Sequence, residues 1–211
     1  MRIGKPQVFE EKQQVVYCVN VASQGSNETL WYAIQAEHAA LLSGLSDAAL
    51  VALLIPAMMR GEDIHLEGTI SAKLHYNLSR PLQKILRHLI PSLHPISIHA
   101  DTLDDGPATR ASGVATGFSG GIDSYCLMAD HFFGEVAPQY KVTHLLFNNL
   151  GTRSEPEFRE RYRRLLPLAQ RFGLPFLAID SNLDHFYAGP LDFQQTHTLR
   201  NPSVAFLVQG G

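Results

Sequence analysis

The sequence has few of the features that mark secreted, membrane-spanning or metal-binding proteins. Only two of its 211 residues are cysteine, Cys18 and Cys126, and they lie far apart without metal-ligand spacing. This usage is typical of a reducing cytoplasm and indicates no disulfide framework. The ten histidines show no H-E-x-x-H spacing, so we expect no zinc site.

Long hydrophobic runs are also missing. The most apolar stretch, residues 48–59, is too short to span a bilayer and contains a proline. The polar start, residues 1–14, does not resemble a signal peptide. We therefore expect a soluble, cytoplasmic protein without a membrane partner.

No excess of charge of either sign is present. The chain has 17 basic and 20 acidic residues, a net charge of −3, and 45% hydrophobic residues, as is usual for a globular protein. The arginines of residues 154–172 raise the question of RNA binding. Glutamates stand four residues before three of them, which favours a solvated helix face with ion pairs. These pairs are Glu155 with Arg159, Glu157 with Arg161, and Glu160 with Arg164.

Residues 1–100 predict a small α+β domain. Two stretches rich in β-branched and aromatic residues are separated by the turn-forming sequence SQGSN, which predicts a hairpin. The hairpin strands are expected at 13–22 and 29–36, further strands at 63–68 and 95–100, and helices at 46–60 and 71–89. The second helix should place Leu74, Leu78, Ile85 and Leu89 on one face and kink at Pro81.

Residues 101–112 are the expected linker, because they are acidic, contain glycine and proline, and lack apolar periodicity. The acidic cluster favours a solvated loop over a metal site.

Residues 113–211 predict the second domain, an α/β unit with a doubly wound parallel sheet, because strands alternate with helices. Strands are expected at 113–118, 142–149 and 174–181, and helices at 124–133 and 154–172. Ser154 and Glu157 form a capping box at the start of the second helix. A last helix should begin at Asn201 with Pro202 in its first turn. Three strands are few for a sheet, so the sheet is either incomplete or completed from elsewhere.

The sequence GFSGGIDSY, residues 117–125, falls between the first of these strands and its helix. Gly120 and Gly121 allow a tight turn and the close approach of an anion to backbone N–H groups. Ser119 and Ser124 add hydroxyl donors, and the helix start adds unpaired N–H groups and partial positive charge. Together they predict a phosphate cradle. Asp123 would repel phosphate directly, so we expect it to hold Mg²⁺ or to cap the loop's own amides.

Neither G-x-x-x-x-G-K-[ST] nor G-x-G-x-x-G is present. The sequence SGGIDS instead resembles the S-G-G-x-D-S signature of the PP-loop ATP pyrophosphatases, the adenine nucleotide α-hydrolase-like superfamily. The resemblance covers residues 113–211. Within the superfamily, TLRNPSVAFL (198–207) is similar to an arginine–asparagine motif of 7-cyano-7-deazaguanine synthases. Their Pro-Gly before the motif and their zinc-binding cysteines have no counterpart here.

The resemblance implies a Rossmann-like, PP-loop fold that binds ATP and Mg²⁺ and cleaves ATP to AMP and pyrophosphate. A substrate carboxylate or carbonyl oxygen would be adenylated, and an amine, ammonia or a sulfur nucleophile would then displace AMP. The pyrophosphate would be held by the cradle residues Ser119, Gly120, Gly121 and Ser124. Adenine would lie near Phe118 and Phe147, which are equally well explained as core residues, and Arg200 and Arg153 would contact phosphate or substrate.

Substrate-binding residues are expected on the loops that follow the strands. By position the candidates are Asn148, Asn149, Arg153, Asp180, Asn182, Asp184 and His185. The sequence leaves several alternatives open. The chain is either an ATP-dependent ligase, a nucleotide-binding module or inactive remnant without turnover, or a relative of phosphoadenylyl-sulfate reductases. The sequence does not show whether the substrate is a small metabolite or tRNA, or whether the protein is a monomer or a homo-oligomer. The first domain either recognises substrate or mediates dimerisation, with Trp31 and Tyr32 as candidate contacts.

Overall fold

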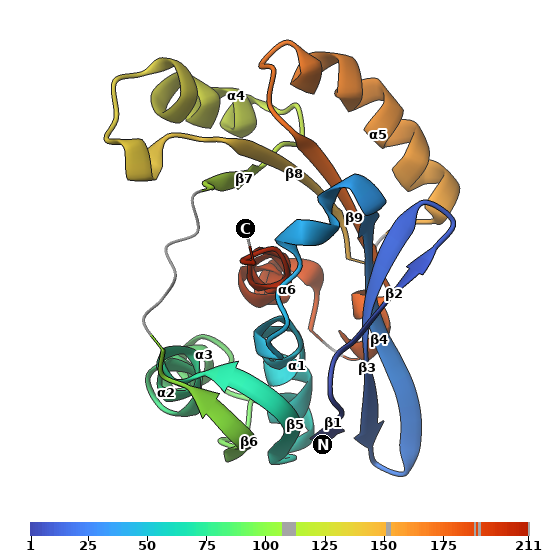
Figure 1. Ribbon diagram of the computed structural model, residues 1–211. Helices are drawn as coiled ribbons and strands as arrows, with labels where there is room; N and C mark the ends of the chain where they lie inside the picture. Colours follow the sequence, from blue (N-terminus) through green and yellow to red (C-terminus); the bar gives the residue numbers. More distant parts are fainter. Residues whose placement is uncertain (107–112, 151–152, 188, 190, 211) are drawn as a thin grey trace.

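The fold is described by a computed structural model for residues 1–106, 113–150, 153–187, 189 and 191–210. Its centre is one nine-stranded mixed sheet in the order β6-β5-β1-β3-β4-β9-β8-β7, with β2 paired to β3 (Figure 1). The strands are β1 (Arg2–Ile3), β2 (Gln7–Glu11), β3 (Gln14–Ser23), β4 (Ser26–Gln35), β5 (Ile64–Ser71), β6 (Ile98–Asp104), β7 (Ala115–Gly117), β8 (His144–Asn149) and β9 (Phe176–Ser181). The predicted α/β class is therefore confirmed in its coarse form.

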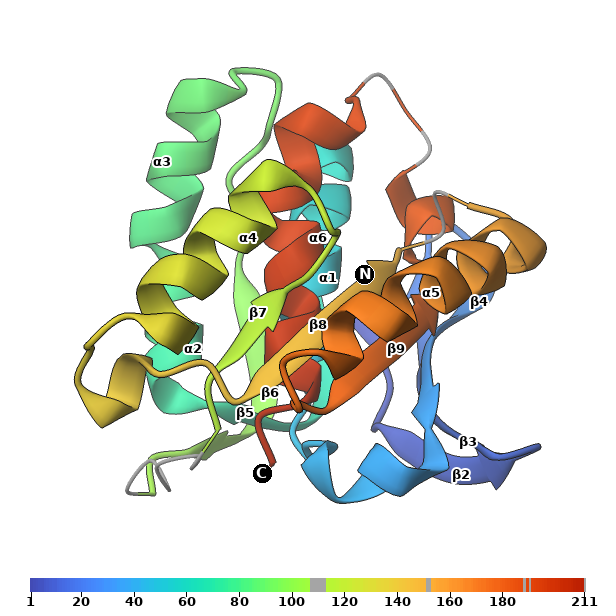
Figure 2. The same cartoon turned by 90° about the horizontal axis from the view of Figure 1, so that it is seen from above.

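Helices cover both faces of this sheet. They are α1 (Asp47–Arg60), α2 (Ala72–Ser79), α3 (Pro81–Leu89), α4 (Ile122–Met128), α5 (Glu155–Gln170) and α6 (Phe193–Leu207), with a π-helical turn (Ala129–Phe133) after α4 and short 3₁₀ turns elsewhere. Figures 1 and 2 show α4 and α5 over one face of β7, β8 and β9, and α1 and α6 side by side on the other. None of the helices in the described ranges is long and apolar enough to cross a membrane.

The parallel part of the sheet is joined to the N-terminal part by strand pairing. β7, β8 and β9 run parallel, as expected for alternating strands and helices, and β9 then pairs antiparallel with β4. One aliphatic core lies beneath both parts, since α6 packs against α1 and shares its buried cluster. The two expected domains thus share a sheet and a core, and their division into residues 1–100 and 113–211 stays a prediction.

The predicted hairpin is confirmed. β3 and β4 are paired along their whole length up to Ser23 opposite Ser26. The two turn residues, Gln24 and Gly25, both have positive φ, 50° and 81°, which matches the twist of a two-residue hairpin turn.

A second helix expected over 71–89 is two helices. Pro81 has no N–H to donate and begins α3, while Arg80 before it leaves helical geometry (φ −138°). The break rotates the later residues out of register. Leu74 and Leu78 are buried as predicted, but Ile85 and Leu89 are 55% and 69% exposed, so their predicted burial is wrong.

Two predicted boundaries are also wrong. Residues 101–104 of the expected linker belong to β6, which pairs with β5, and only residues 105 and 106 of its described part lie outside the strand. Residues 107–112 lie outside the described residues. The last helix begins at Phe193, not after Asn201. Asp192 accepts the N–H of Gln195 at 2.9 Å in a capping box, and Pro202 lies inside the helix. This local cap outweighs the proline signal.

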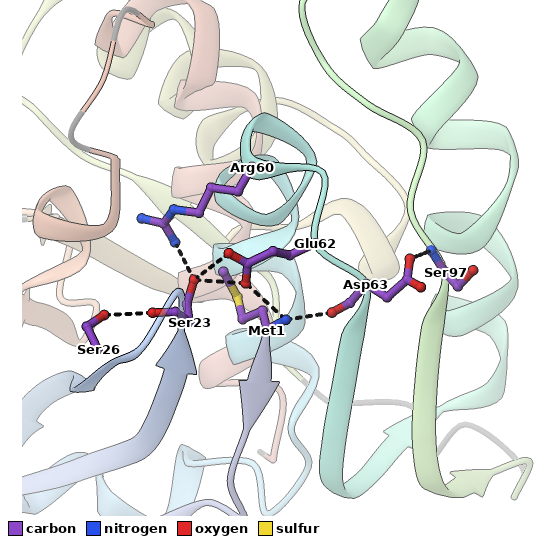
Figure 3. A network of polar contacts seen from close by, with 7 residues as sticks. All are labelled: Met1, Ser23, Ser26, Arg60, Glu62, Asp63 and Ser97. Atoms are coloured by element: carbon purple, nitrogen blue, oxygen red, sulfur yellow. Dashed lines mark hydrogen bonds and ion pairs between the residues drawn. The ribbon is translucent and has the colours of Figure 1, made fainter.

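The network in Figure 3 fixes the residues that immediately precede three strands. The N-terminal amine of Met1 donates to the Asp63 carbonyl at 2.7 Å and pairs with the Glu62 carboxylate at 3.1 Å. Ser97 N–H donates to the Asp63 carboxylate at 2.7 Å, and the Ser23 hydroxyl donates to Glu62 at 2.9 Å. The starts of β1, β5 and β6 are therefore aligned at the end of the sheet where Ser23 closes β3.

Candidate functional site

The glycine loop, defined here as Ser119–Ser124, connects β7 to α4 at the carboxyl end of the parallel strands. Phe118 N–H still donates to the Leu146 carbonyl at 2.8 Å, which fixes the chain at the end of the strand. Gly121 then has extended backbone (φ −85°, ψ 173°) and precedes the helix. The loop thus lies at the sheet edge where open α/β folds bind ligands.

Serine hydroxyls hold the loop in shape from within. Ser119 N–H donates to the Ser124 hydroxyl at 3.0 Å, and the two hydroxyls lie 3.1 Å apart. Gly121 N–H approaches the Ser119 hydroxyl at 3.4 Å. Ser124 is buried and Ser119 is exposed, so one serine anchors the loop and the other faces solvent. The first N–H groups of α4 have no partner within their own helix.

Gly120 has a conformation that other residues rarely adopt. Its φ is +71°, and a Cβ atom built on it would lie 2.7 Å from Leu165 Cδ2 on α5. The left-handed backbone therefore favours glycine at this position, and a Cβ atom would also force the end of the Leu165 side chain to shift. Gly117, three residues earlier, has no atom within 4 Å of a built Cβ.

Asp123 is exposed in the first turn of α4. The described residues contain no group of three or more histidine, cysteine, aspartate or glutamate side chains that could hold a metal ion. Asp123 therefore fits Mg²⁺ only as one ligand beside phosphate oxygens and water, which is the coordination that Mg²⁺ prefers. Nearby Cys126 is exposed on α4.

The structure does not support adenine contacts by Phe118 and Phe147. Phe118 is 1% exposed, with its ring edge-on to Tyr125 and Phe172 at centroid distances of 5.6 Å. Phe147 is 5% exposed and stacks on Phe158 at 5.2 Å. Both belong to an aromatic core between the sheet and the helices α4 and α5. Aromatic side chains enclosed in this way are core residues, as the alternative interpretation held.

Arg200 is also buried and contacts other residues of the protein. Its side chain is 3% exposed, forms an ion pair with Asp184, and lies over the ring of Tyr187 at 3.9 Å. The Arg200 Nε atom has no hydrogen-bond partner in the described part of the chain. Burial raises the pKa of the Tyr187 hydroxyl, the positive charge of Arg200 opposes this rise, and Tyr32 adds to it. A phosphate contact by Arg200 is not supported, because its guanidinium is held by these neighbours.

Four of the seven candidate substrate residues come together after β8 and β9, and three do not. Asn149, Arg153, Asp180 and Asn182 border one hollow of about 570 Å³. Asp184 pairs with Arg200, and His185 pairs with Glu28 at 2.7 Å. Asn148 points to the opposite face of the strand, where its Oδ1 is buried without a partner among the described residues.

The hollow also contains residues that sequence reasoning did not place there. Trp31, suggested as a partner contact, forms one wall, whereas Tyr32 is fully buried and hydrogen-bonds Ser203 at 2.9 Å. Phe158 and Tyr162 of α5 line it as well. The sequence does contain a sign of this difference. Side chains alternate between the two faces of β4, so Trp31 points away from the face that buries Leu30 and Tyr32.

No protein-family model matches this chain, and neither the curated proteins nor the solved structures include a significant match to it.

Proposed function

We propose that the glycine loop binds the phosphates of ATP and that the protein is an ATP-dependent enzyme of the PP-loop type. The observation that carries the proposal is the conformation of Gly120 beside Leu165, at the carboxyl end of β7. The left-handed glycine directly follows Ser119, so the exposed Ser119 hydroxyl and the backbone N–H groups at the start of α4 lie within one short segment. Such a segment suits an anion at a helix start.

In the proposed reaction, an oxygen of the acceptor substrate attacks the α-phosphorus of ATP. The bond from the α-phosphorus to the oxygen bridging to the β-phosphate breaks, and pyrophosphate leaves with the electron pair. The Ser119 hydroxyl and the N–H groups of Gly121 and Ile122 would stabilise the negative charge on the leaving group. Asp123 would hold Mg²⁺, which neutralises phosphate charge. A nucleophile then displaces AMP from the adenylated acceptor. Positioning and charge neutralisation supply the rate gain.

A second candidate is a module that binds ATP without turnover. The position of Arg200 favours this module. Arg200 is the cation expected to stabilise the developing charge, but it is buried and paired with Asp184. In this alternative the loop still binds the nucleotide, so ATP binding tests both candidates and product analysis separates them.

The test titrates the chain with ATP and Mg²⁺ and follows pyrophosphate and AMP release. We expect wild-type protein to bind ATP and Asp123→Ala to bind at least about tenfold more weakly, as for a lost charged partner. Asp130→Ala is the matched control, since Asp130 is also exposed and follows the same helix but lies outside the loop. Equal binding by the three proteins, or no binding by wild type, would refute the nucleotide site. Release of AMP with pyrophosphate supports the enzyme, and binding without it supports the module.

A further inference from the structure

The hollow beside Trp31 has the form of a small-molecule site. Trp31 and Ala33 project from the outer face of β4, and Ala33 lies directly opposite Asp180 of β9. The small Ala33 and Ala178 side chains leave the sheet surface low between the indole on one side and α5 on the other. The resulting volume of about 570 Å³ is in the usual range for ligand pockets, roughly 300–1,000 Å³. We call it the Trp31 hollow.

A carboxylate stands at the floor of the Trp31 hollow. Asp180 Oδ1 accepts the amide of Asn149 at 2.8 Å and the N–H of Ser181 at 3.0 Å, which fixes its orientation. Within the described residues it has no ion-pair partner. Burial raises the pKa of this carboxyl, and the hydrogen bonds and Arg159 oppose the shift only in part. A cationic group from a ligand would relieve the cost of desolvating this carboxylate.

Cations stand at the rim of the same hollow. Asn149 binds the Arg153 backbone through both ends of its side-chain amide: its Nδ2 donates to the Arg153 carbonyl at 3.0 Å, and its Oδ1 accepts the Arg153 backbone N–H at 3.1 Å. One asparagine therefore connects Arg153 to Asp180. Arg159 lies farther along α5 in an ion pair with Glu155. Two arginines and two carboxylates thus border the hollow, which is neutral overall but has separated charges.

We propose that the Trp31 hollow binds a zwitterionic α-amino acid with an apolar side chain. The ammonium group would pair with Asp180 and the carboxylate with Arg153, while the side chain would lie against Trp31 and Ala33. A simple anion would meet the repulsion of Asp180 and Glu155, and a simple cation that of the two arginines. A zwitterion matches both charges and leaves the neutral balance unchanged. This proposal is independent of nucleotide binding, because it uses none of the glycine-loop residues.

The test uses Trp31, the only tryptophan in the chain, as a fluorescent reporter, and repeats each titration by calorimetry. The probe is L-leucine, and no nucleotide is added. L-leucinamide lacks the carboxylate, and N-acetyl-L-leucine lacks the ammonium group. We expect L-leucine to bind and each of the two analogues to bind about 10- to 100-fold more weakly, as for the loss of one charged contact.

Substitutions then assign the two charges. Asp180→Asn should weaken L-leucine binding about tenfold or more and bring its affinity close to that of N-acetyl-L-leucine. Arg153→Gln should likewise weaken L-leucine binding about tenfold or more and bring its affinity close to that of L-leucinamide. Arg163→Gln is the matched control, because Arg163 is exposed on α5 and does not border the hollow. No binding of L-leucine by either method, equal affinity for the analogues, or equal losses in the control would overturn the proposal.

Discussion

The glycine loop and the Trp31 hollow lie at the same edge of the sheet and are built in opposite ways. The loop consists of six consecutive residues whose hydroxyls and N–H groups bind one another. The hollow is lined by residues of β4, β9, α5 and the segment after β8, and charged side chains are among them. A site of consecutive residues leaves a motif in the sequence. A site assembled from distant segments leaves only scattered polar residues that resemble turn formers.

The two sites also rest on different parts of the molecule. The loop is supported by the aromatic core under α4 and α5, where Phe118 follows directly from β7. The hollow lies on the outer face of the β4–β9 pair, and the aliphatic core lies behind that pair. Phe158 and Tyr162 of the aromatic core also line the hollow, whereas Phe118 does not. We therefore expect changes at Phe118 to alter stability without altering amino-acid binding. The predictions below test this separation.

The largest effect is expected from Gly120→Ala. The new Cβ would meet Leu165 and force a left-handed backbone on alanine, so stability should fall by about 1–3 kcal/mol. ATP affinity should fall with it, while L-leucine binding persists. Urea unfolding and both titrations measure this. Gly117→Ala, with open space and no positive φ, should change each quantity little. Equal losses in the two variants would contradict the role assigned to Gly120.

Phe118→Leu tests the core assignment against the adenine contact. Removing part of a ring that packs on Tyr125 and Phe172 should lower the free energy of unfolding by about 1–3 kcal/mol. ATP affinity of the folded protein should stay within about twofold, since a buried ring offers no surface to a base. Tyr140→Leu, on a 59% exposed ring, should cost less than about 0.5 kcal/mol. A selective loss of ATP affinity in Phe118→Leu would restore the adenine contact.

Ser154→Ala should cost about 1 kcal/mol by removing the cap of α5, the helix that forms one wall of the hollow. Hydrogen bonds from the Ser154 side chain and N–H also lower the pKa of Glu157. Their contribution to stability is present above the ordinary glutamate pKa and is lost as pH falls through the lowered pKa. The loss in Ser154→Ala should therefore shrink in acid. Asp192→Ala removes the cap of α6 by the same chemistry and should not affect L-leucine binding. Urea unfolding between pH 3 and pH 7 measures the stabilities, and a loss that grows in acid would count against this cap.

The smallest effect is a pH dependence from Asp180. Burial raises the pKa of this carboxyl above 3.8, so the folded state holds the proton more tightly than the unfolded state. As pH rises from 3.8 through the raised value, the wild type should lose stability relative to Asp180→Asn. Unfolding of both proteins across this range checks the sign. A wild-type advantage that grows with pH would show that hydrogen bonds outweigh burial at this site.

Local signals in the sequence predicted much of the fold. The hairpin turn at Gln24 and Gly25 and the capping box at Ser154 were both confirmed, because each depends on neighbouring residues alone. Two of the three predicted ion pairs on α5 are formed, while Glu157 binds Ser154 instead of Arg161. The predicted start of α6 is wrong, because the sequence offers two local helix signals. The capping box at Asp192 begins the helix and outweighs the signal of Pro202.

The glycine loop, the strand and helix on either side of it, and the alternation of strands and helices in an α/β fold could all be predicted from the sequence. These follow from backbone conformation and side-chain periodicity, which act over a few residues. The folded structure was needed to show that β9 pairs with β4, that Arg200 is buried against Asp184 and Tyr187, and that Trp31 and Asp180 border one hollow. Pairing between distant strands and burial against distant helices depend on the packing of the whole chain, and no local pattern encodes them.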